Sequence, residues 1–341
     1  MSQTSAFSLP PMGRRAVLSG VAGALLGAAG CSSSAPRSAH PSGTTSPAAR
    51  PTQGAAGTPS PTPSATLPRT TPWRPTSAEV DPAAKLRAVE LVEAIGAWSR
   101  GQGGAAAARS RVTALGLPAA LVDEAGPLRP SAQEAALQVI DAQYGGILSS
   151  SASVLVVCRQ WTLNSGKLTA GGTTVDVRLV RSAHGWTVTA LHPAAPGPGA
   201  ASLASDIRAA LADSRIVLPP AAEADLRSGN VHTSVAKAML TLAGTYRLGV
   251  SVVRSGHPLD VFGTNRPSDH PRGRAFDVWQ IDGRPVVDPA TPRTLIERFM
   301  RDAAAAGSYN VGGPVRLQGG AVGQFFSDAT HHDHVHVGFR T

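Results

Sequence analysis

Two short stretches near the C-terminal end contain the residue types that bind transition metals. The first covers residues 268–277 and includes His270 and Asp277, and the second is the His-Val-His sequence at 334–336. A catalytic zinc site uses three protein ligands and leaves a fourth position open for water. His270, Asp277 and His336 supply two imidazoles and one carboxylate, a donor set that suits Zn²⁺ better than Ca²⁺ or Mg²⁺. The sequence therefore predicts one zinc site built from both stretches.

The expected backbone brings these side chains together. Gly273 lies between the two ligands of the first stretch, at a point where a non-helical turn is easy. Apolar residues alternate through 335–339, which indicates a strand whose period of two puts His334 and His336 on one face. One of these histidines can bind the metal while the other carries protons. By the same period, Asp333 is expected to point away.

The two stretches also carry a recognisable pattern. Residues 268–277 match S-x-H-x-x-G-x-A-x-D at every fixed position, and the H-x-H pair follows near the end of the chain. Together they resemble the zinc D-alanyl-D-alanine carboxypeptidase family, within the superfamily shared with lysostaphin-type endopeptidases and hedgehog. The resemblance covers residues 201–341. It implies an α+β fold around a small antiparallel sheet, one Zn²⁺, and hydrolysis of peptide bonds in bacterial cell-wall peptides.

The resemblance also assigns roles to residues. His270, Asp277 and His336 match the metal ligands of the family, and His334 matches the catalytic acid–base. Ser268 matches the motif serine, which is expected to support the ligand loop and not to attack. The implied enzyme is a metallopeptidase, either a carboxypeptidase or an endopeptidase acting on peptidoglycan.

One position departs from the family pattern. Members commonly carry an arginine shortly after a Ser-Gly pair upstream of the motif, where it pairs with substrate. Here the pair is Ser255 and Gly256, and Pro258 stands where that arginine would be. Arg254 and Arg266 are the nearby cations that could bind a substrate carboxylate instead. The departure keeps open an alternative function, a non-catalytic zinc-containing module that binds peptidoglycan.

Two other interpretations also remain open. His331 and His332 extend the histidine run, which could form an unstructured metal-binding tail. The domain before the motif could be the functional part, with the C-terminal domain as a wall anchor, if it held a deep apolar pocket with convergent polar groups.

The N-terminal segment indicates export. Residues 1–31 combine Arg14 and Arg15, an apolar stretch, and small residues before Cys31, which resembles the cleavage site of a bacterial lipoprotein signal peptide. The arginine pair also resembles a twin-arginine signal. Residues 32–76 are rich in Ser, Pro and Thr and predict a disordered tether. We therefore expect lipidation at Cys31, with the protein on the outer face of the cytoplasmic membrane or in the cell wall.

After residue 76 the sequence predicts two small α+β domains, at residues 77–193 and 201–341, joined by a Pro/Gly/Ala-rich linker. A helix is expected to start near Pro82, and Cys158 lies in an apolar run that indicates a buried thiol. The last hairpin of the first domain resembles that of the nuclear-transport-factor-like fold, and a spacer or partner-binding role is expected for this domain. Further helices are expected at residues 131–144, 202–212, 231–243 and 294–306, and strands at 153–163, 173–182, 185–191 and 249–254.

The overall charge suits an anionic surface. The chain of 341 residues has a formal net charge of +9 at pH 7. Lys and Arg are scattered and form no basic stripe interleaved with aromatic residues, so nucleic acid is not an expected partner. Cell-wall polymers and lipid headgroups carry the complementary charge.

Overall fold

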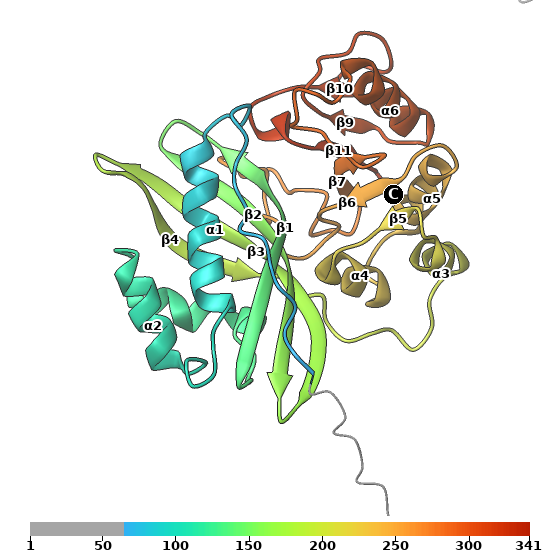
Figure 1. Ribbon diagram of the computed structural model, residues 1–341. Coiled ribbons are helices and arrows are strands. Elements are labelled where there is room, and N and C mark those ends of the chain that lie inside the picture. The colour runs from blue at the N-terminus through green and yellow to red at the C-terminus, as the bar shows by residue number, and fades with distance from the viewer. Residues whose placement is uncertain (1–64) are drawn as a thin grey trace, which may run out of the picture. The chain divides into compact units, whose positions relative to one another are not determined.

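The computed structural model describes residues 65–341, which belong to one compact unit of the chain (Figure 1). This unit contains two large hydrophobic cores, one formed between residues 84 and 191 and the other between residues 207 and 339. Each core lies within one of the two expected α+β regions, but both cores belong to one compact unit. The expected signal peptide, the lipidated Cys31 and the tether up to residue 64 lie outside the described residues.

The first core contains a long helix packed on a sheet. α1 (Pro82–Gly96) begins after Asp81, whose side chain accepts a hydrogen bond from the Ala84 N–H at 3.3 Å. Its apolar side chains recur at helical spacing, are buried, and contact all four strands of the sheet (Figure 1). The predicted helix start is therefore confirmed. Three short helices follow: α2 (Ala105–Ala114), η1 (Ala119–Glu124) and η2 (Gly126–Leu128).

The sheet beside α1 is an antiparallel meander in the order β1-β2-β3-β4. The helix predicted over residues 131–144 is wrong, because this segment is a strand. Ala135, Leu137 and Val139 are buried while their neighbours are half-buried, which is a period of two. Alanine, leucine and glutamine favour helices locally, but pairing with the β-branched neighbouring strand overrides that preference. The strands are β1 (Glu134–Ile147), β2 (Ser151–Asn164), β3 (Lys167–Ser182) and β4 (Gly185–Pro193).

The end of the expected tether contacts the first core. The Thr71 N–H donates to Gln138 Oε1 at 2.8 Å, and Gln138 Nε2 donates to the Thr71 carbonyl at 2.9 Å. Trp73 packs against the core as a half-buried side chain. The chain is therefore held against β1 from about Thr71, before the predicted end of the tether at Thr76.

The second core surrounds a seven-stranded sheet whose main path runs β10-β9-β11-β7-β6-β5. The sheet is mixed, which corrects the expectation of an antiparallel one: β5 pairs with β6, and β10 with β9, in parallel. The β5–β6 pair is parallel because two helices form the crossover between its strands. The strands are β5 (Ile216–Val217), β6 (Leu248–Val250), β7 (Ala275–Ile281), β8 (Arg284–Pro285), β9 (Asn310–Gly312), β10 (Phe325–Phe326) and β11 (Val335–Gly338).

The helices of this region agree with three of the predicted ones and add one that was missed. α3, α5 and α6 lie within one or two residues of the ranges expected near 202–212, 231–243 and 294–306, apart from a later start of α3. α4 was not predicted, since it has only about two turns and such a short segment gives little helical periodicity. The helices are α3 (Ser205–Ala212), α4 (Pro220–Arg227), α5 (Thr233–Ala243), α6 (Arg293–Ala305) and η3 (Thr330–His332).

The two cores meet at a small apolar cluster. Ile140 of β1 packs against buried Leu155, Val157 and Val252, the last of which follows β6. Cys158 is fully buried in the first core, as predicted, and burial raises the pKa of its thiol to about 12. Within residues 65–341, no helix is both long and apolar enough to span a membrane.

Candidate metal centre

Strand pairing brings two of the predicted ligands together. Asp277 on β7 lies directly opposite His336 on β11 in an antiparallel ladder, and residues in such a pair project from the same face. The third predicted ligand, His270, lies on the turn that precedes β7. Gly273 shapes this turn with a φ of +68°, and its N–H donates to the His270 carbonyl at 2.8 Å.

The potential ligand atoms form a tight triangle. His270 Nε2, His336 Nδ1 and Asp277 Oδ1 are each 3.1 Å from the other two. Ligand atoms of a tetrahedral zinc site, with bonds of about 2.0–2.1 Å, lie roughly 3.3 Å apart. The three residues are at most 7 % exposed. Their donor types, spacing and burial therefore fit a small divalent cation.

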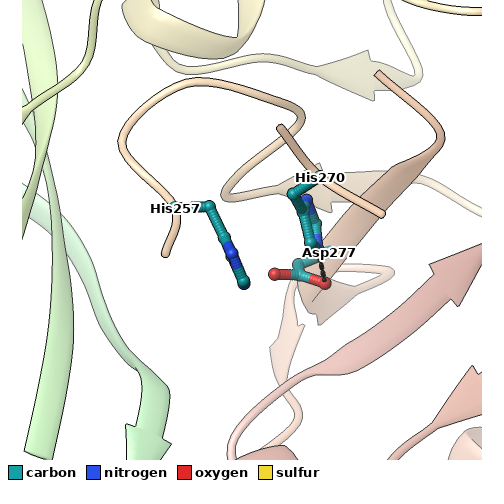
Figure 2. Close-up of side chains that lie close together, drawn as sticks. All are labelled: His257, His270 and Asp277. Atoms are coloured by element: carbon teal, nitrogen blue, oxygen red, sulfur yellow. Dashed lines mark hydrogen bonds and ion pairs between the residues drawn. The ribbon is translucent and has the colours of Figure 1, made fainter. Parts of the chain in front are cut away.

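A further histidine lies beside these residues. His257, His270 and Asp277 form a group whose potential ligand atoms lie within 4.8 Å of one another, so they could hold a metal ion. Figure 2 shows the rings of His257 and His270 stacked, with the Asp277 carboxylate next to His270. The ring centroids are 4.1 Å apart and the planes differ by 16°. Because an imidazole binds metal in its ring plane, an ion in the plane of His270 lies off the plane of His257. We therefore favour His336 as the third ligand, with His257 covering one side.

Hydrogen bonds and electrostatics hold the potential ligands in protonation states that can bind a cation. His270 Nδ1 lies 2.8 Å from the Val253 carbonyl, so it carries the proton and leaves the Nε2 lone pair toward the cluster. Burial lowers the pKa of His336 to about 4, which keeps its ring neutral near pH 7. Burial alone would raise the pKa of Asp277, but electrostatic interaction and hydrogen bonding with the neighbouring histidine rings hold it well below its ordinary range. Neutral imidazoles and an ionised carboxylate are the forms that bind metal.

His334 faces the cluster from the residue before β11. Its Nε2 lies 3.8 Å from Asp277 Oδ2, and its Nδ1 lies 2.6 Å from Asp333 Oδ1. Burial lowers the pKa of this imidazole, but the Asp277 charge and the Asp333 hydrogen bond outweigh burial and raise the pKa to about 9. The prediction that Asp333 points away is wrong. Asp333 has helical backbone angles of −106° and −4°, so the alternation of the strand does not extend to it.

A cavity of about 540 Å³ opens onto the cluster. Its volume lies within the usual range for a small-molecule site. Its wall includes His257, His270, His334 and His336. Arg266 is the one Lys or Arg among its described lining residues. Part of the wall comes from the end of β1 and the turn after it, at Tyr144, Gly145, Ile147 and Leu148.

The other predicted site residues have distinct positions. Ser268 Oγ accepts a hydrogen bond from the His270 N–H at 3.4 Å and lies 3.4 Å from His257 Nδ1, so it supports the ligand loop. Arg254 is not brought to the cluster. It lines a second cavity, and its Nη2 donates to the Pro196 carbonyl at 2.6 Å.

The histidines near the end of the chain are ordered. His331 lines the cavity, and its Nδ1 lies 2.8 Å from Asp328 Oδ1. His332 Nε2 lies 2.8 Å from the Ala78 carbonyl, in the segment before α1. Both belong to η3, so the alternative of an unstructured histidine tail is wrong.

Two residues near the site were not predicted. Gln143 of β1 contacts Asp277, and Lys85 of α1 contacts Asp333. Both belong to the first core, far away in sequence, and a lone Gln or Lys in an amphipathic segment gives no signal of such a contact.

In comparisons with known proteins, no family model, no curated protein and no solved structure matched this chain.

Proposed function

We propose that this chain is a zinc-dependent peptidase that acts on peptidoglycan peptides and is similar to the D-alanyl-D-alanine carboxypeptidases. The observation that carries the proposal is the triangle of His270 Nε2, His336 Nδ1 and Asp277 Oδ1, at 3.1 Å on each side, with the His334 ring beside it. The triangle supports zinc because a ligand set of two imidazoles and one carboxylate is found in hydrolytic zinc sites. A bound zinc ion polarises carbonyl groups and acidifies water.

The protein's own contribution to hydrolysis is proton transfer by His334. Its Nδ1 donates to Asp333, which fixes the ring so that Nε2 faces the ligands. The Asp277 charge helps to raise the pKa of His334, so a cation bound by Asp277 would offset that charge and favour the neutral ring. In its neutral form Nε2 can accept a proton from the attacking water and deliver it to the leaving amine. The Asp333 carboxylate stabilises the imidazolium that forms between these two steps, as a carboxylate does in other His-dependent hydrolases.

Arg266 is the residue we propose for substrate binding. It is exposed at the cavity wall, on the loop before the ligand turn. A guanidinium binds a carboxylate through two parallel hydrogen bonds, so Arg266 suits a peptide that ends in a free carboxylate. This position would replace the arginine whose expected place is taken by Pro258.

The alternative is a zinc-containing module that binds peptidoglycan without cleaving it. Such a module needs a metal and a cavity but no proton carrier. His334 lines the cavity and is held by the buried Asp333 carboxylate, and this arrangement favours the peptidase.

The test uses the protein from Ser32 onward, loaded with zinc and mixed with muropeptides of defined structure. Mass spectrometry should show release of D-alanine or cleavage of a cross-bridge. His334→Ala should lower the rate at least 10²-fold, because a general acid–base contributes about 10²–10⁴-fold, and should leave one zinc bound. The matched control is His184→Ala, which removes an exposed histidine at the β3–β4 turn. A wild-type protein that binds one zinc and cleaves no muropeptide would contradict the peptidase and leave the binding module.

We also propose that the protein is exported and attached by a lipid on Cys31 to the outer face of the cytoplasmic membrane. The support is the signal-like sequence of residues 1–31 and the Ser/Pro/Thr-rich stretch after it.

A further inference from the structure

We infer that the first core is part of the metal centre, and that its residue Gln143 is a positioning residue for the metal ligand Asp277. This inference rests on the proposed metal site and goes beyond it, because the resemblance to known peptidases covers residues 201–341 and does not include residues 77–193. The region expected to be a spacer would then be required for metal binding.

The contact itself is short, buried and directional. Gln143 is 0 % exposed, and its Nε2 donates to Asp277 Oδ2 at 2.7 Å. Its Oε1 accepts a hydrogen bond from the Ser251 hydroxyl, which fixes the orientation of the amide. The two oxygens of Asp277 are therefore divided: Oδ1 faces the two histidines and Oδ2 is held by Gln143. Without this donor, the carboxylate could rotate, and Oδ2 would lose its hydrogen bond in a buried place.

The shape of β1 explains how a strand of the first core reaches the ligand. Its pairing with β2 shifts register between Val139 and Asp141 and again between Tyr144 and Gly146. Such bulges bend a strand and redirect its side chains. Gln143 lies between the two bulges. At the second bulge the backbone approaches the C-terminal region so closely that a Cβ on Gly146 would lie 2.0 Å from Phe262 Cβ.

A second contact from the first core ends on the other functional side chain. Lys85 Nζ lies 2.6 Å from Asp333 Oδ2, and the same oxygen accepts a hydrogen bond from the Tyr144 N–H at 3.0 Å. Asp333 Oδ1 in turn holds His334. Lys85 is 1 % exposed and also pairs with buried Glu79.

If these polar contacts served only to hold the two cores together, they would be less favourable than apolar ones. Burying charged groups at a junction between two cores is unfavourable unless each is paired, and apolar residues would hold the two cores together as well. Both polar chains end on residues of the proposed site, one on Asp277 and one on His334. Support of this kind fixes the orientation of ligands and proton carriers.

The experiment measures metal binding, with zinc as the probe and a fluorescent chelator as competitor. Gln143→Met keeps the shape of the side chain and removes the N–H donor. We expect its zinc affinity to fall about 10–100-fold, the usual effect of losing such a partner, and the visible spectrum of the Co²⁺-loaded protein to change. The matched control is Gln160→Met, another buried glutamine of the same sheet, whose Nε2 donates to the Gly96 and Leu128 carbonyls away from the site. It should keep wild-type affinity and spectrum even if it lowers stability.

A Gln143→Met protein with wild-type zinc affinity and an unchanged Co²⁺ spectrum would overturn the inference. If Gln143→Met does not fold, Ser251→Ala replaces it, because that variant frees the Gln143 amide from its partner while retaining the N–H donor. It should weaken zinc binding by a smaller factor, and an unchanged affinity would equally count against the inference. The experiment does not measure peptide cleavage. If zinc binding depends on Gln143 but the protein cleaves no peptide, only the proposed peptidase activity is refuted.

Discussion

Gly273 gives a direct test of how the ligand turn is built. Its φ of +68° is in the left-handed region, and a Cβ added there would lie 2.1 Å from the Asn230 carbonyl oxygen, which belongs to backbone. Gly283 is a matched position, with a φ of +78° and no atom within 4 Å of the place a Cβ would take. Alanine in this conformation costs about 1–2 kcal/mol at either site. The backbone clash at Gly273 should add about 1–3 kcal/mol, the typical cost of overpacking.

The assay is urea unfolding of the metal-free Gly273→Ala and Gly283→Ala proteins, followed by zinc competition on both. The effect of alanine on the unfolded chain is the same in the two variants and cancels in the comparison. Gly273→Ala should therefore unfold at a lower urea concentration than Gly283→Ala. It should also bind zinc at least tenfold more weakly, because the turn carries His270. Equal midpoints and equal affinities would refute the assignment of Gly273 as the residue that lets the chain pass Asn230.

Two further predictions concern stability and location. Burial raises the pKa of Asp141 to about 7 from an ordinary 3.8, and its Oδ2 is buried without a hydrogen-bond partner. The folded protein therefore holds this proton more tightly than the unfolded chain does. The resulting contribution to the free energy of unfolding is fully present below about pH 4 and is lost as the pH rises through 7. The loss is at most about 4 kcal/mol. Asp141→Asn should gain stability over the wild type in urea unfolding at pH 8 and little at pH 4, and an equal difference at both pH values would contradict this. Cys31→Ser should move the protein from the membrane fraction to the soluble fraction of the producing cell, and unchanged retention would refute lipid attachment at Cys31.

The clustering of the three proposed ligands could be predicted because their signals are local. His270 and Asp277 lie on one turn and the strand that follows it, and His336 belongs to a short alternating strand, so residue type, period and the resemblance of the two motifs pointed to one site. The structure adds that Asp277 and His336 are cross-strand partners. That pairing depends on the order of the strands, which the sequence does not state.

The parts that were missed depend on contacts between distant segments. Gln143 is 134 positions from Asp277, and no local pattern marks such a contact. The same region was predicted as a helix, which would have placed Gln143 on a different face from the one that β1 presents. Asp333 was misplaced for a different reason: the period of the strand was extended one residue past the point where the backbone turns helical.

The bulged part of β1 has a thermodynamic consequence for the whole unit. Gln143 of the first core donates to Asp277 in the second. If Asp277 binds an ion, as proposed, ion binding and folding of the first core would be linked, and each would favour the other to the same extent. At a free ion concentration 100 times the dissociation constant, such linkage adds about 2.7 kcal/mol to the free energy of unfolding. The two cores would share that gain and unfold together when the ion is bound. Metal supply would then set the lifetime of the entire folded chain as well as the occupancy of one site.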